Sequence, residues 1–460
     1  MLENVFFKTR KLAMLCGNAV SRNNEDVTDF LIGKFGDKRL SAMGGLIFKR
    51  ICNKLTACIK NLAGTRALEV GFGRFLRNDK VSISEIERTL AEKTNSNCIG
   101  KSHVLAISDT VECTFPGHKI KKSKFGFTSD KTTKGFLGHP VVVVDAKNKD
   151  ILGICSIEVW NREDEELEPR QKRLIEDKES YKWIHAAQNT AKNITNPDKI
   201  TMIYDREGDI YELFDRVPSN KIELLIRSNY DRILENNISL SEHMSGINVA
   251  KQYQIELPAI TGKRTARTAT MALKFSKITL RKPKDIKECN NQTIEVTCVE
   301  ATEISVPPND EKPVYWRILT THNVTNPEEA LQIVIWYTWR WTVEQLFRTV
   351  KTKGFDIENS QVEEPSVLLK IFVLGLAAAV QVMCLVHARD GSTTRPASDI
   401  FSDLEIMVLC QLIIKLQGKT VKQQNPFQSR SLSWASWIIA RLGGWTGYKK
   451  ASPPGLLATV

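Results

Sequence analysis

Two short apolar runs, each followed by an aspartate, constrain the fold of this chain more than any other feature. Residues His103–Ser108 precede Asp109, and residues Lys199–Tyr204 precede Asp205. Apolar runs of this length are typical of strands that are covered on both faces, as in the sheets of α/β proteins. Neighbouring parallel strands end at one edge of a sheet, where open α/β sheets bind ligands. The pattern therefore predicts that the two carboxylates lie close together.

Two neighbouring carboxylates repel each other unless a cation lies between them. Their hard oxygen atoms, with no histidine or thiolate beside them, favour Mg²⁺ or Mn²⁺ over Zn²⁺. The alternative interpretation is that each aspartate only caps the end of a strand or the start of a helix. Asp145, which follows the valine-rich run Pro140–Val144, fits the same pattern and keeps this alternative open.

The remaining hydrophobic pattern predicts an α/β fold with a mixed sheet. Residues 232–325 contain alternating and β-branched segments between Gly, Pro and Lys residues, which predicts a β-rich insertion. Further strands are expected at 151–160 and 222–227, and helices at 27–62, 181–194, 210–217, 327–353, 364–415 and 432–442.

The composition excludes several classes of protein. With 42% hydrophobic and 26% charged residues, the chain is neither disordered, collagen-like nor a coiled coil. The longest apolar run, Ile371–Val380, is much shorter than the about 20 residues that cross a bilayer, so no membrane insertion is expected. The ten cysteines include no Cys-x-x-Cys pair and are expected to be buried free thiols in a reducing cytosol.

Positive charge is concentrated at the start of the chain. Residues 1–80 hold 15 Lys and Arg against 7 Asp and Glu, which is +8 of the total net charge of +12. Such a segment favours a polyanionic partner, nucleic acid first, although a lysine-rich solvated surface explains the composition equally well. The basic side chains that this helical segment offers to such a partner include Lys38, Arg39, Arg74 and Arg77.

Residues 337–351, taken as one helix, place five polar side chains on one stripe. At 100° per residue the following side chains fall within about 80°: Tyr337, Arg340, Glu344, Arg348 and Lys351. One carboxylate among donors that bind phosphate is what a metal-dependent phosphodiester site requires. The alternative is an amphipathic helix whose solvent-exposed face carries salt bridges.

The ordered motif Tyr-x2-Arg-x3-Glu-x6-Lys in this stripe, together with Asp109 and Asp205, resembles the signature of a known family. These are the DDE transposases of bacterial insertion sequences, in the cut-and-paste IS-four group. Further similar segments extend nearly from end to end of the chain: Gly36–Arg39, Arg74–Asn78, Glu363–Pro365 and Ala440–Gly444.

The resemblance implies a fold and a division into domains. Residues 81–365 would form an RNase H-like catalytic core, with a mixed five-stranded sheet and flanking helices. The β-rich insertion at 232–325 would interrupt this core, and the catalytic helix would lie at about 327–353. Residues 1–80 would be a helical domain that binds terminal inverted repeats, and residues 366–460 a helical dimerisation region.

The resemblance also implies a reaction. Asp109, Asp205 and Glu344 would hold two Mg²⁺ ions, with Mn²⁺ as a substitute. Members of the family nick the transposon end, form and reopen a hairpin there, and join the end to target DNA. The implied partners are double-stranded DNA, both terminal inverted repeats and target, and a second copy of the chain in a synaptic complex. The implied location is the bacterial cytoplasm, at the nucleoid.

The resemblance also assigns roles to six further residues. Trp316 and Trp341 match tryptophans that stack on a flipped base, and Arg227 matches a basic residue near the hairpin phosphates. Arg340 and Lys351 would hold the phosphates of the scissile end, with a hydrogen bond added by Tyr337. From the residues alone, both tryptophans read as core side chains, and Arg227 reads as a surface charge at a strand end.

Three functions remain open from the sequence. An active, metal-dependent DNA transposase is the leading interpretation. The second is a decayed or inhibitory copy that binds DNA without catalysis, and the third is an RNase H-like nuclease without strand transfer. The complete acidic set favours an enzyme over a binding protein.

Overall fold

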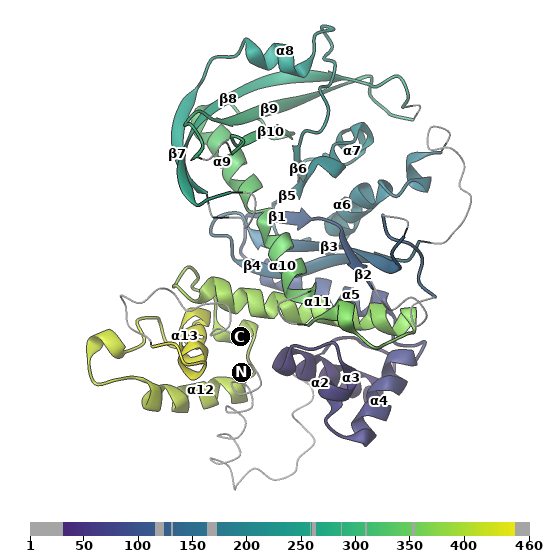
Figure 1. The fold of residues 1–460 in the computed structure, drawn as a ribbon, viewed down its shortest axis with the longest axis vertical. Coiled ribbons are helices and arrows are strands. Elements are labelled where there is room, and N and C mark those ends of the chain that lie inside the picture. The colour runs from purple at the N-terminus through teal and green to yellow at the C-terminus, as the bar shows by residue number, and fades with distance from the viewer. Residues whose placement is uncertain are drawn as a thin grey trace. The chain divides into compact units, whose positions relative to one another are not determined.

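Figure 1 shows a computed structural model of the chain. The structure describes residues 31–446, apart from 116–123, 130–131, 163–172, 258, 260–263, 287, 309–310 and 352–354. The chain forms two compact units. Unit 1 contains the described parts of Met1–Ile99, Thr110–Asp164 and Glu344–Val460, and unit 2 those of Gly100–Asp109 and Glu165–Val343. The outer parts of the predicted terminal regions, 1–30 and 447–460, lie outside the described residues.

Unit 2 is built on a mixed sheet, which confirms the predicted α/β class. Three parallel strands come first, β1 (His103–Ser108), β5 (Lys199–Tyr204) and β6 (Ile222–Arg227). The sheet continues with antiparallel strands in the order β10 (Tyr315–Thr320), β9 (Thr293–Glu303), β8 (Arg267–Arg281) and β7 (Lys251–Leu257). Residues 104–108 and 200–204 are buried, as expected for strands covered on both faces.

The predicted β-rich block at 232–325 is present, and it continues the sheet of parallel strands. Its last strand, β10, pairs antiparallel with β6, with Ile318 opposite Arg227. The block also contains helix α8 (Leu240–Ser245), which the sequence pattern did not predict. The backbone groups along the outer edge of β6 are therefore hydrogen-bonded by the block itself.

Besides α8, the described helices of unit 2 include α6 (Tyr181–Asn193), α7 (Tyr211–Arg216) and α9 (Pro327–Thr338). Helix α6 is fixed to β5 by two fully buried aromatic residues. The Tyr204 hydroxyl donates to the Trp183 carbonyl oxygen at 3.1 Å, and the two rings meet edge to face at 4.9 Å. Helix α9 packs against β8 and β9 (Figure 1).

The prediction of a single helix over 327–353 is wrong. Helix α9 ends at Thr338, and α10 (Trp341–Lys351) begins after a turn at Trp339 and Arg340. In this turn the amide of Arg340 donates to the carbonyl of Tyr337, and the amide of Val343 donates to that of Arg340. These bonds span three residues, which winds the backbone more tightly than an α-helix. Tyr337 and Lys351 therefore do not share one continuous helical face.

Unit 1 is organised around helix α11 (Pro365–Ala388), which packs against β4 (Ile151–Trp160), α2 (Lys38–Lys54) and α13 (Leu432–Leu442) (Figure 1). With 24 residues, α11 is longer than its apolar sequence run suggested. By length and composition it is the one helix among the described residues that could cross a membrane. Its most apolar window is 89% buried inside the protein, as in the core helix of a globular fold.

The remaining elements of unit 1 are α3 (Ile59–Ala63), α4 (Arg66–Arg77), α5 (Ile83–Asn97), α12 (Asp403–Leu416), β2 (Val111–Thr114) and β3 (Gly135–Asp145). Strand β3 pairs antiparallel with β2 and β4. Helix α5 lies on β4, where the Thr94 hydroxyl donates to the Ile154 carbonyl at 2.7 Å. Gly153 allows this approach, since a Cβ there would lie 2.1 Å from the Thr94 hydroxyl oxygen.

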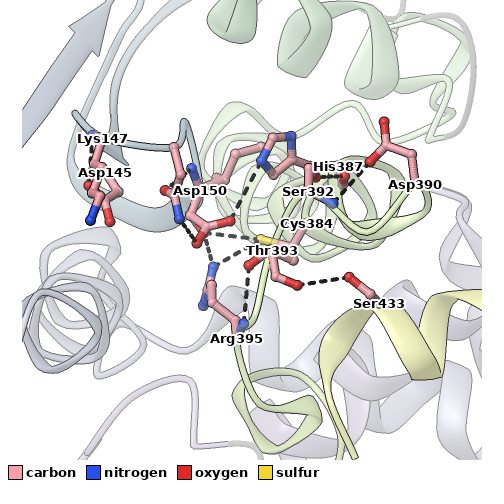
Figure 2. A network of polar contacts seen from close by, with 12 residues as sticks. Asp145, Lys147, Asp150, Cys384, His387, Asp390, Ser392, Thr393, Arg395 and Ser433 are labelled. Carbon is pink, nitrogen blue, oxygen red and sulfur yellow. Dashed lines mark hydrogen bonds and ion pairs between the residues drawn. The ribbon is translucent and has the colours of Figure 1, made fainter. Parts of the chain in front are cut away.

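A buried polar network ties the turn between β3 and β4 to α11 and to the segment between α11 and α12 (Figure 2). Arg395, 9% exposed, donates to the Ile151 carbonyl and to the Asp399 carboxylate at 2.6 Å. His387 Nε2 lies 3.6 Å from Asp150 Oδ1. Because buried polar groups are costly without partners, this network fixes the three segments in one arrangement.

All nine described cysteines are free thiols, as predicted, although four of them are only partly buried (Cys52, Cys58, Cys289 and Cys410). Cys16 lies outside the described residues. The predicted division into three domains stays a prediction.

Two histidines share one hydroxyl group in unit 2. The Thr201 hydroxyl lies 2.8 Å from both His103 Nε2 and His322 Nε2, and the His103 ring meets the Trp336 ring edge to face at 4.8 Å. Burial, together with the positive charge of Lys199, lowers the pKa of His322 to about 4. His322 is therefore neutral at physiological pH.

This shift predicts a pH-dependent loss of stability. Because the folded-state pKa of His322 is below the ordinary value, its contribution is complete above about pH 6.5 and declines as the pH falls toward 4. We expect the free energy of unfolding to fall between pH 7.5 and 5 by roughly 1–2 kcal/mol more in the native protein than in His322→Gln. Urea-unfolding curves at the two pH values measure the difference. Equal pH dependence of the two proteins would contradict a neutral buried imidazole.

Candidate functional site

The candidate site begins where β1 and β5 end. These strands pair in parallel, with Val104 opposite Ile200 and Ile107 opposite Ile203. Continued by two residues, this register puts Asp109 level with Asp205. The side chains of the two aspartates are 22% and 31% exposed, so both carboxylates can be reached from solvent. The predicted meeting of these two aspartates is supported by the strand register.

The guanidinium of Arg340 contacts both carboxylates. One terminal nitrogen donates to Asp109 Oδ2 at 2.9 Å, and the other lies 3.8 Å from Asp205 Oδ2. The Arg340 side chain is only 9% exposed. Since two carboxylates side by side repel each other, this cation stabilises their proximity. Arg340 stands in the turn between α9 and α10, and its side chain faces inward to the two carboxylates.

Tyr337 completes this group from the last turn of α9. Its hydroxyl donates to Asp205 Oδ1 at 3.1 Å, and its side chain is buried. Burial, assisted by the negative charge of Asp205, raises the pKa of Tyr337 to about 12. The phenol thus keeps its proton at physiological pH and remains a hydrogen-bond donor.

A second buried ion pair fixes the loop that follows β6. Asp209 Oδ1 accepts from Arg232 at 2.5 and 3.0 Å, and Asp209 Oδ2 accepts from the backbone amides of Asn229 and Tyr230. Both side chains of the ion pair are at most 7% exposed. This pair positions the strand end that carries Arg227, whose guanidinium donates to the Tyr315 carbonyl at 3.3 Å. The sequence pattern assigned no role to Asp209, because its pairing with Arg232 has no local signal in the sequence.

The two candidate tryptophans do not behave as core residues. Trp341 is 44% exposed at the first position of α10, and Trp316 is half-buried on β10. By contrast, Trp183 is 1% exposed. The Trp316 ring lies 6.3 Å from the Tyr337 ring at an angle of 63°. Trp316 is therefore beside the Asp205 group and partly open to solvent.

The other three residues of the predicted stripe belong to unit 1. Glu344 lies half-buried in the first turn of α10, and Arg348 is exposed in its last turn. Lys351 Nζ donates to the Glu112 carbonyl at 2.8 Å and pairs with Glu358 at 3.0 Å. These contacts give Lys351 a structural role within unit 1. A shared site of Glu344 with the two aspartates stays a prediction.

Asp145 follows the same sequence pattern as Asp109 and Asp205 but has a different structural role. It closes β3 in unit 1, and its carboxylate accepts from the amide of Lys147 at 2.9 Å in the turn before β4. Its side chain is thus used as a turn cap, which is the alternative that the sequence left open.

The four basic candidates in the N-terminal segment are all exposed: Lys38, Arg39, Arg74 and Arg77. The first two stand at the start of α2, where the Asp37 carboxylate caps the helix by accepting from the Arg39 amide. Arg77 pairs with Glu364 at 2.9 Å, so part of its charge is already neutralised. Arg74, on the same helix as Arg77, has no resolved ion pair of this kind in the part of the chain that the structure describes.

The chemistry of the site fits a hard divalent cation. Asp109 and Asp205 offer carboxylate oxygens, and Mg²⁺ is usually held by one or two carboxylates together with waters and substrate phosphates. Among the described residues, no group of three His, Cys, Asp or Glu side chains is arranged to hold a metal ion. Asp109 and Asp205 are the candidate ligands that unit 2 offers to such an ion.

Comparison with known proteins adds little to this geometry. No family model matches the chain. Among solved structures, the chain is similar to one in the cryo-EM structure of the piggyBac transposase synaptic complex with hairpin DNA. The two are 12% identical with a TM-score of 0.37, over 91% of this chain and 80% of the other. A similarity at this level describes a distant resemblance of fold.

Proposed function

We propose that this protein is a metal-dependent DNA transposase of the DDE type, which cuts transposon ends and joins them to target DNA. The observation that carries the proposal is the pair Asp109 and Asp205 at the ends of adjacent parallel strands, with Arg340 and Tyr337 bound to them. Paired carboxylates with adjoining phosphate-binding donors suit phosphodiester chemistry. The sequence signature adds Glu344 as the third carboxylate.

In the proposed reaction, bound Mg²⁺ would supply activation of the attacking hydroxyl and stabilisation of the leaving oxygen. Asp109, Asp205 and Glu344 are the proposed ligands. Tyr337 holds Asp205 in place through its hydroxyl, and Arg340, Arg227, Arg348 and Lys351 are the proposed phosphate contacts. Lys351 would have to leave its Glu358 partner to reach DNA, which makes it the weakest of these assignments.

The hairpin step is assigned to the exposed aromatic residues. A flipped nucleotide loses its stacking in the duplex, and a partly open tryptophan beside the carboxylates can replace it. Trp316 meets this requirement because it is half-buried and its ring lies 6.3 Å from that of Tyr337. Trp341, 44% exposed, is the proposed second surface.

The remaining parts of the proposal concern partners. The basic helices α2 to α4 bind the terminal inverted repeats, and the helical region after residue 366 makes the homodimer of the synaptic complex. The exposed side chains of Lys38, Arg39 and Arg74 support the first assignment. The proposed location is the bacterial cytoplasm, at the nucleoid.

The first prediction separates Asp205 from a residue with the same sequence pattern. Asp205→Asn should lower Mg²⁺-dependent nicking of a transposon end by more than about 100-fold, since even outer-shell partners of a metal contribute about 10–100-fold. DNA binding should remain, because it depends on basic contacts elsewhere. Asp145→Asn is the matched control and should keep its nicking rate. Gel assays of nicking and of band shift measure both properties.

The outcomes also separate the alternatives. An Asp205→Asn protein that still nicks DNA would exclude the proposed catalytic pair. A native protein that binds ends but never cleaves them would be a decayed or inhibitory copy. Cleavage without joining of the 3′ end to target DNA would make the protein a nuclease.

The second prediction concerns Trp316. As a stacking surface it should contribute about 1–3 kcal/mol to holding an extruded base and little to the fold. Trp316→Ala should keep its melting temperature and nicking rate but form hairpins more slowly, and an abasic site at the flipped position should partly restore the rate. Trp183→Ala is the core control and should lose about 3–5 kcal/mol of stability. A comparable fall in melting temperature for both variants would show that Trp316 is a core residue.

The third prediction tests the basic helices. The double variant Lys38→Glu/Arg74→Glu should bind terminal-repeat DNA more weakly. The slope of the logarithm of its affinity against the logarithm of the salt concentration should fall by the amount expected for about two phosphate contacts. Lys419→Glu/Lys422→Glu changes the net charge equally at exposed positions after α12 and is the control. Fluorescence anisotropy across a salt series measures both. Equal weakening by the two double variants would mean that only net charge matters.

A further inference from the structure

The guanidinium of Arg340 lies where a cation between Asp109 and Asp205 is expected. It contacts Oδ2 of each carboxylate, at 2.9 Å for Asp109 and 3.8 Å for Asp205. These are negatively charged oxygens that a divalent ion would also use. Arg340 is 7% exposed, so its charge is poorly screened by water.

We propose that Arg340 is an internal counter-cation that is exchanged for metal when DNA binds. Without metal, its single positive charge offsets part of the negative charge of Asp109 and Asp205. When a divalent ion binds the two carboxylates, Arg340 moves to a phosphate of the bound DNA. Metal and DNA therefore strengthen each other's binding. The inference rests on the proposed function and adds a regulatory role for one of its residues.

The exchange follows from charge and geometry. Mg²⁺ and Mn²⁺ bind carboxylate oxygens at much shorter distances than a guanidinium does, about 2.0–2.1 Å for Mg²⁺. A divalent ion there would lie a few ångströms from the positive charge of Arg340, in a half-buried site where repulsion is strong. Arginine released in this way has a natural new partner, because its planar fork binds phosphate through two hydrogen bonds.

The surrounding residues allow Arg340 to leave without disordering the site. Tyr337 binds Oδ1 of Asp205, whereas Arg340 contacts Oδ2. The tyrosine can therefore keep this carboxylate oriented after the guanidinium has moved. Arg340 also stands in the turn between α9 and α10, where its backbone is not inside a regular helix.

The experiment measures metal binding directly. Mn²⁺ is titrated into the full-length protein, with and without a short DNA duplex that carries the terminal repeat, and free Mn²⁺ is followed by electron paramagnetic resonance. Without DNA, Arg340→Leu should bind Mn²⁺ about 10-fold more tightly than the native protein, within the usual range of coupling between sites. In this variant, DNA should hardly strengthen Mn²⁺ binding, so that the Mn²⁺ affinities with and without DNA are nearly equal.

Two further variants control for charge and folding. Lys221→Leu removes the same charge from a side chain of unit 2 that donates to the Thr195 carbonyl, and the Mn²⁺ affinity of this variant without DNA should change less than about threefold. Arg340→Lys keeps the charge but cannot contact both carboxylates with one planar group. Its Mn²⁺ affinity without DNA should therefore lie between those of the native protein and Arg340→Leu. If Arg340→Leu melts at a lower temperature in EDTA than the native protein, addition of Mn²⁺ should raise its melting temperature to the native value.

The outcomes distinguish this inference from the proposed function. Mn²⁺ binding that requires Asp205 but is unchanged or weakened in Arg340→Leu would overturn the exchange and leave the transposase proposal intact. A native protein that binds no Mn²⁺ at Asp205, with or without DNA, would overturn both.

Discussion

The parallel pairing of β1 with β5 is the interaction on which the candidate site depends. Both strands are buried, and burial of their side chains fixes the register, since a slip of one residue would turn each side chain to the opposite face. This register brings Asp109 level with Asp205. The ion pairs of Arg340 and the hydrogen bond of Tyr337 are possible only because the strand ends meet there.

Strands β1, β4, β5 and β6 match the ranges predicted from the sequence, whereas β2 was not predicted, β3 extends beyond the run 140–144, and the helices near the site differ from the prediction. In the runs 199–204 and 222–227, all residues except Lys199, Glu223 and Arg227 are buried, which distinguishes these runs from their surroundings. The break between α9 and α10 has no such signal, because Trp339 and Arg340 are neither Gly nor Pro. At this break, Arg340 is buried beside two carboxylates, which is a tertiary interaction. Local helical periodicity does not predict a break of this kind.

The candidate site shows the same division between local and tertiary information. The sequence predicted Asp109 and Asp205 but gave Asp145 the same pattern. What separates them is the strand that follows: β3 turns directly into antiparallel β4, so Asp145 caps a tight turn. The inward position of Arg340 and the buried pair of Asp209 with Arg232 depend on residues far apart in the chain, and periodicity does not report such contacts.

The pairing of β6 with β10 has a consequence for how this protein could be altered or could evolve. Since β10 completes the hydrogen bonds of β6, the β-rich block is not a detachable cassette. Its deletion would leave the backbone amides and carbonyls of a largely apolar strand open at the edge of the sheet. Such an edge recruits strands from other molecules, so a shortened protein would tend to aggregate rather than persist as a smaller folded protein.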